Sequence, residues 1–105
     1  MLVQQRIAEA AARFVVEEDF RSPSTARLLT EVVPSHTSME NPREFERQIK
    51  RLHLLIFGRD VGLDSQEVAA NAALWEQIYA VSADAYEAWV GLLSALLRDP
   101  DFLIY

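Results

Sequence analysis

The chain contains no cysteine, only three glycines and four prolines, and no long apolar run. Without thiols it has no disulfide framework, no thiolate metal site and no cysteine nucleophile. Because no apolar run approaches the ~18 residues that a membrane span needs, we expect no transmembrane helix. None of the glycines stands in the phosphate-loop or nucleophile-elbow patterns that mark nucleotide-binding and hydrolase sites. These absences exclude several common enzyme and membrane classes.

The start of the chain does not have the pattern of a signal peptide, because Arg6, Glu9 and Arg13 interrupt any apolar core. We therefore expect a cytoplasmic protein. A domain taken from a longer exported chain would begin in the same way, so that origin stays open at this point.

What is present is the composition of a globular domain, since half of the 105 residues are hydrophobic and a quarter are charged. This length suits one domain over residues 1–105. The net charge of −6 is uneven: residues 1–59 hold nine basic and eight acidic side chains, whereas residues 60–105 hold one basic and eight acidic ones. The acidic second half repels phosphate backbones, so nucleic acid would have to bind the first half.

Apolar residues recur at the 3.6-residue spacing of amphipathic helices, and no window alternates for long in the manner of a strand. The predicted buried stripe of a first helix comprises Val3, Ile7, Ala10 and Phe14, widened by Ala11 and Val15. This helix stops near Val16 or continues through the acidic residues 17–19, which are unfavourable at a helix C-terminus.

Residues 22–25 (SPST) combine capping hydroxyls with a proline, which is a signal for the start of a helix. We expect a short helix from Ala26 to Val33, ended by Pro34. Its inward residues would be Leu28, Leu29 and Val32. Residues 35–40 show no periodicity and are predicted to form a loop.

Three longer helices follow. The strongest spans Pro42 to Phe57, the next spans about Gln66 to Val81, and the last runs from a cap at Ser82 or Asp84 to about Leu97. Their predicted inward residues include Phe45, Ile49, Leu52, Ile56, Val68, Ala72, Trp75, Tyr79, Trp89, Leu92, Leu93 and Leu96. The predicted fold is all-α, a single compact bundle of five or six helices.

The second half, about residues 45–105, resembles a group of bacterial segments. The order of residues 52–60 (LHLLIFGRD), the acidic cap with Glu67, and residues 89–103 (WVGLLSALLRDPDFL) carries the resemblance. It is similar to the helical C-terminal segments of large, uncharacterised proteins of planctomycete and myxobacterial type. The resemblance implies an accessory helical domain and supplies no activity. Some of those proteins carry cytochrome c domains, but this cysteine-free chain has no haem-attachment motif.

Residues capable of catalysis or metal binding are few. The two histidines, His36 and His53, lack a partner ligand of the right type on the same helical face, so we expect no metal site. The adjacent acids at residues 17–19 and the pair Asp99 and Asp101 are predicted to be solvated or to cap helices. We expect no catalytic residue, no cofactor and no enzymatic activity.

The candidate partner-binding residues form two groups. One is the basic stripe, which consists of Arg43, Arg47, Lys50 and Arg51, spaced to share one face of the predicted helix 42–57. Self-pairing or solvation, a protein partner and nucleic acid all remain possible for this stripe, although Glu44 and Glu46 lie beside it and aromatic residues for base stacking are missing. The other group is the apolar chain end with Phe102 and Tyr105, which either docks on the bundle or contacts a partner.

These observations predict a non-enzymatic helical module for protein–protein interaction or assembly, as an accessory part of a bacterial complex. The partner is another protein or a second copy of the chain. The alternative is a small regulator that contacts nucleic acid through the basic stripe.

Overall fold

A computed structural model describes residues 3–33, 35–37, 39–62 and 65–98, with side chains from Arg6 onward. Within these ranges the chain forms α-helices and one short 3-10 turn, and no strand. The elements are α1 (Val3–Arg21), η1 (Pro23–Thr25), α2 (Pro42–Phe57), α3 (Gln66–Ser82) and α4 (Ala85–Leu97). The all-α class is confirmed, but the four α-helices of the described residues are fewer than the five or six predicted.

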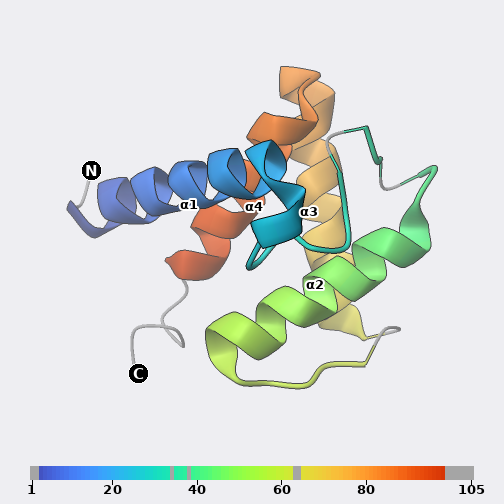
Figure 1. The fold of residues 1–105 in the computed structure, drawn as a ribbon. Helices are drawn as coiled ribbons and strands as arrows, with labels where there is room; N and C mark the ends of the chain where they lie inside the picture. Colours follow the sequence, from blue (N-terminus) through green and yellow to red (C-terminus); the bar gives the residue numbers. More distant parts are fainter. Residues whose placement is uncertain (1–2, 34, 38, 63–64, 99–105) are drawn as a thin grey trace.

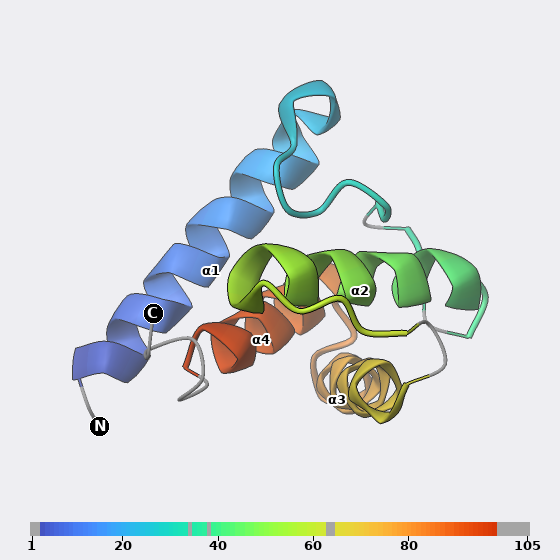
Figure 2. The same ribbon diagram turned by 90° about the horizontal axis from the view of Figure 1, so that it is seen from below.

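The last helix, α4, is the centre of the arrangement. It packs against both α1 and α3, and α2 packs against α3. Figure 1 shows α1 crossing α4, and Figure 2 shows α2 lying over α4 with α1 and α3 on opposite sides. The expectation that this helix is buried on more than one side is confirmed, because seven of its 13 residues are buried.

Aromatic rings join α2, α3 and α4 in the core. The rings of Phe45 and Trp75 meet edge to face with centroids 4.6 Å apart, and Phe45 lies 5.0 Å from Trp89. Trp75 in turn stacks on Tyr79 at 5.0 Å. Phe45 and both tryptophans are buried, which confirms that these aromatic residues belong to the core. Such pairs add about 1 kcal/mol each beyond the burial of their area.

The ends of the helices follow their capping residues. The side chain of Ser65 accepts a hydrogen bond from the Val68 N–H, and Asp84 accepts one from the Tyr86 N–H at 2.9 Å. Gly58 ends α2 in the left-handed region at φ 68°, where a side chain would be strained. The predicted bounds of α2 and α4 are thus confirmed, and α3 ends one residue later than expected.

The predicted helix from Ala26 to Val33 does not form. One of its hydrogen bonds would join the Arg27 carbonyl to the Glu31 N–H, but side chains of α2 bind both groups. The Arg27 carbonyl accepts from Arg51 Nη2 at 2.9 Å, and the Glu31 N–H donates to Gln48 Oε1 at 2.9 Å. A helix of eight residues has little intrinsic stability, so these contacts with α2 prevail. Leu29 and Val32 are nevertheless buried as expected.

The first helix runs past Val16 to Arg21, through the three acidic residues. The reason is Asp19, which is buried with only 6% of its surface exposed. Its carboxylate accepts hydrogen bonds from the backbone N–H groups of residues 27, 28 and 29, at 3.2, 3.0 and 2.9 Å. One acid of the predicted solvated run is therefore a structural anchor that holds the chain after η1 against α1.

The face of α1 that packs inward is not the predicted one. The buried residues are Ala8, Ala12, Val16 and Asp19, and Val15 is half-buried. Ile7 and Phe14 point to solvent, with 63% and 64% of their surfaces exposed. Because Ala8 and Ala12 are small, they let α1 approach the bulky residues of α4 closely, and this packing outweighs burial of the larger side chains on the opposite face.

We expect the replacement Asp19→Ala to lower the free energy of unfolding by about 3 kcal/mol, because it leaves backbone N–H donors without an acceptor in a buried place. The neighbouring Glu18→Ala is the matched control. It removes only an exposed contact with Arg21, worth less than about 0.5 kcal/mol. Urea unfolding followed by circular dichroism measures both. Equal effects of the two replacements would contradict the role of Asp19.

Candidate protein-interaction surfaces

The basic stripe lies on the outer face of α2, opposite the buried residues of that helix. Arg51 is anchored through its bond to the Arg27 carbonyl. Lys50 pairs with the exposed Asp60 at 3.2 Å. Arg43 and Arg47 are exposed, and the side chain of Arg47 donates a hydrogen bond to the carbonyl of Arg43 within the same helix. The stripe therefore divides into two residues held within the fold and two arginines that face solvent.

A leucine continues the basic stripe. Leu54 lies one turn beyond Lys50, and half of its surface is exposed. A shallow hollow of about 270 Å³ lies beside it, lined by Glu31, Arg47, Lys50, Arg51 and Leu54. The adjacent Leu55 is also 47% exposed. Exposed leucines surrounded by basic side chains form a surface of mixed character, which we call the α2 surface: the basic stripe together with Leu54.

A second apolar surface lies on α1. The side chains of Ile7, Ala10, Ala11 and Phe14 are all exposed and share one face of this helix. We call these four residues the α1 face. The sequence predicted that these residues are buried. In the structure they instead form an exposed apolar face, and no other described residue covers it.

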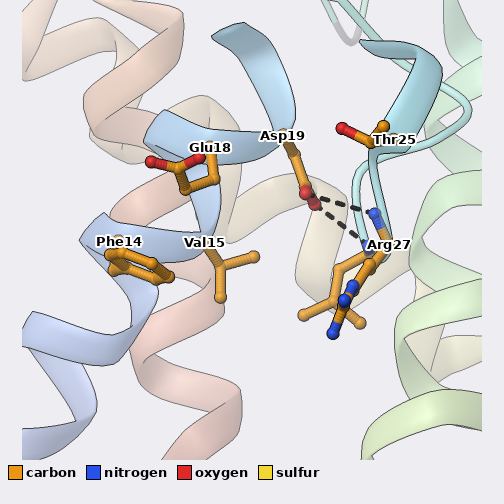
Figure 3. Close-up of a pocket in the computed structure, with 7 residues that line it drawn as sticks. Phe14, Val15, Glu18, Asp19, Thr25 and Arg27 are labelled. Atoms are coloured by element: carbon orange, nitrogen blue, oxygen red, sulfur yellow. Dashed lines mark hydrogen bonds between the residues drawn. The ribbon is translucent and has the colours of Figure 1, made fainter. Parts of the chain in front are cut away.

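A hollow of about 540 Å³ adjoins the α1 face at Phe14, and Leu28 and Thr25 contribute to its opposite wall. Figure 3 shows Asp19 turned toward the backbone beside Arg27, to which it is hydrogen bonded, rather than into open space. The other acid in the wall, Glu18, pairs with Arg21 at 3.1 Å. Both carboxylates are thus engaged, and the hollow offers mainly apolar contact.

The two histidines have structural partners. His36 Nδ1 accepts a hydrogen bond from the Val33 N–H at 3.3 Å, within the turn that precedes α2. His53 is buried between α2 and α3, where its Nε2 lies 2.6 Å from Nδ2 of Asn71. In the part of the chain that the structure describes, no three His, Asp or Glu residues are grouped to hold a metal ion.

Charged side chains link α1 to α4. Arg13 forms two hydrogen bonds with Glu87, at 2.8 and 3.3 Å. The bond raises the pKa of Arg13 and lowers the pKa of Glu87. Beside them, burial raises the pKa of Tyr86 to about 12, and the nearby carboxylate of Glu17 adds to this shift. Among the described residues the Tyr86 hydroxyl has no hydrogen-bond partner of good geometry.

Comparisons with known proteins identify no family. No family model matches the chain, no curated protein is similar to it, and no solved structure matches its fold. The resemblance to bacterial C-terminal segments therefore stays a prediction. In the described ranges, no helix is both long and apolar enough to cross a membrane. Phe102 and Tyr105, the predicted contact residues at the chain end, lie outside the described residues.

Sequence reasoning missed both apolar surfaces, although signals for them existed. In α1 two apolar stripes compete, and the one with small residues at Ala8 and Ala12 marks close packing between helices. In α2 the run from residue 52 to 57 holds more apolar residues than a single stripe can bury, so Leu54 and Leu55 face outward.

We expect Tyr86 to lose its proton only near pH 12 in the folded protein. Its raised pKa means that the neutral side chain favours the folded state, and this stabilisation is present below pH 10 and disappears as the pH rises through about 12. Ultraviolet absorbance of tyrosinate, followed against pH, measures the titration. The component near pH 12 should be missing in Tyr86→Phe, and its persistence in that variant would contradict the assignment.

Proposed function

We propose that this chain is a non-enzymatic assembly module that binds an acidic, apolar segment of a partner protein on the α2 surface. The observation that carries the proposal is Leu54, which is half exposed within the basic stripe and beside a hollow. An exposed leucine beside basic side chains and a concavity suits the binding of a partner segment that carries both apolar and acidic residues.

The geometry suits one anchoring side chain. The hollow of about 270 Å³ beside Leu54 is large enough to seat a leucine or phenylalanine of the partner. Contact with Leu54 and the aliphatic stem of Lys50 would remove apolar surface from water on both sides. Apolar anchors of this kind supply most of the affinity in protein interfaces.

The charges suit acidic residues on either side of that anchor. Arg43 and Arg47 project from successive turns of α2 and face solvent. Within the described part of the chain Lys50 pairs with the exposed Asp60, and a partner carboxylate can replace that pair at little cost. Opposite charges of this kind raise the association rate and fix orientation more than they raise affinity.

A protein partner fits these residues better than nucleic acid. Glu31 lines the hollow, where the apolar anchor of the partner would sit and where a phosphate group would be repelled. The α2 surface holds leucine rather than the aromatic rings on which unpaired bases stack. The contact between α2 and a nucleic-acid backbone is therefore the weaker alternative, and the experiment below separates the two.

The probe is a fluorescent helical peptide with glutamates and leucines at i, i+4 spacing, and binding is read by polarisation at low salt. We expect Leu54→Glu and Arg47→Glu each to weaken binding roughly tenfold or more, through lost apolar contact and lost charge attraction. A peptide with serine in place of leucine should bind much more weakly. Circular dichroism confirms that each variant stays folded.

The matched control is Arg21→Glu, which reverses an exposed charge at the end of α1, away from the α2 surface. It should leave peptide binding unchanged apart from a small effect of net charge. Single-stranded and double-stranded oligonucleotides of the same length serve as competing probes. Binding of oligonucleotides that depends on Arg47 but not on Leu54, with no binding of the peptide, would overturn the proposal in favour of the nucleic-acid alternative.

A further inference from the structure

The α1 face is an apolar surface on a single helix that has no partner among the described residues. Ile7 and Phe14 are both more than 60% exposed, and Ala10 and Ala11 lie between them. The four positions are spaced symmetrically within residues 7–14. One large residue lies at each end of this stretch, and two alanines lie in the middle. This order is self-complementary under a two-fold axis.

We propose that the α1 face binds the α1 face of a second copy of this chain, with the two helices antiparallel. The two-fold axis passes beside Ala10 and Ala11, where small side chains let the backbones approach. Ile7 of each copy then packs against Phe14 of the other. The α2 surface is not involved, because it lies on another helix.

The charges at the ends of the α1 face favour the antiparallel arrangement. Arg6 and Glu17 are both exposed and lie three helical turns apart on the same flank of the face. In an antiparallel pair the same flank of each helix meets, so Arg6 of one copy comes close to Glu17 of the other, twice over. In a parallel two-fold pair one flank of each helix meets the opposite flank of the other, so Arg6 and Glu17 would not come together.

The size of the face predicts a weak dimer. A single helix of 19 residues is about 28 Å long and offers less surface than the 800 Å² per partner of a standard interface. The hollow beside Phe14 adds some apolar contact at each end. We therefore expect a dissociation constant of roughly 10–100 µM and a mixture of monomer and dimer at such concentrations.

Sedimentation equilibrium over a range up to about 500 µM tests the proposal with the complete chain. We expect the wild type to dimerise and Phe14→Glu to be monomeric over the whole range. The control Val81→Glu changes a side chain that is 90% exposed on α3, so it should dimerise like the wild type. Both positions are exposed, so both variants should fold, and circular dichroism checks this.

A charge exchange tests the antiparallel orientation. Arg6→Glu and Glu17→Arg should each weaken the dimer severalfold, and the double variant should restore it, because the opposite charges again meet across the two-fold axis. A parallel arrangement of the two helices does not predict this rescue. If both single variants dimerise weakly and the double variant does not regain the wild-type affinity, the antiparallel orientation is wrong.

A thiol gives a third readout, since the chain has no cysteine of its own. Oxidation of Ala10→Cys should produce a disulfide-linked dimer in high yield, whereas Ala80→Cys, at an exposed position of α3, should not. A wild type that is monomeric throughout would overturn the proposal. Dimerisation only after deletion of residues 99–105 would overturn it as well, and would show that the chain's own end competes for the α1 face.

Discussion

The packing of Phe45 against Trp75 and Trp89 is the contact on which the rest of the structure depends. These rings bring together three consecutive helices, and all three side chains are buried. Because α2 is fixed to α3 and α4 in this way, its opposite face is held outward with the basic stripe and Leu54. The position of the α2 surface is thus a consequence of the core and not of the surface residues themselves.

Two buried polar side chains then determine the path of the chain between α1 and α2. Asp19 binds three backbone N–H groups, and Gln48 binds the Leu28 carbonyl and the Glu31 N–H with the two ends of its amide. Together they satisfy backbone groups that a helix would otherwise pair. The segment between the helices is therefore ordered by side chains from both sides, although it has almost no regular secondary structure.

The comparison of sequence and structure separates local from non-local causes. The bounds of α2 were predictable because Pro42 and Gly58 act within a turn of their own positions. The non-helical conformation of residues 26–33 was not predictable, because it depends on Gln48 and Arg51, which lie about twenty residues away. The buried face of α1 was mispredicted for the same reason, since α4 selects between two apolar stripes. Of the candidate site, the basic stripe was found from spacing, but the exposure of Leu54 was not.

The dependence of α1 on α4 has a consequence for synthesis on the ribosome. Helix α1 packs mainly against α4, so its residues Ala8, Ala12 and Val16 find these contacts only after α4 has been translated. At 5–20 residues per second the interval is roughly 4–15 s. During that time both apolar stripes of α1 lack the cover that α4 gives to one of them in the finished fold. The finished fold buries one of these stripes and leaves the other exposed.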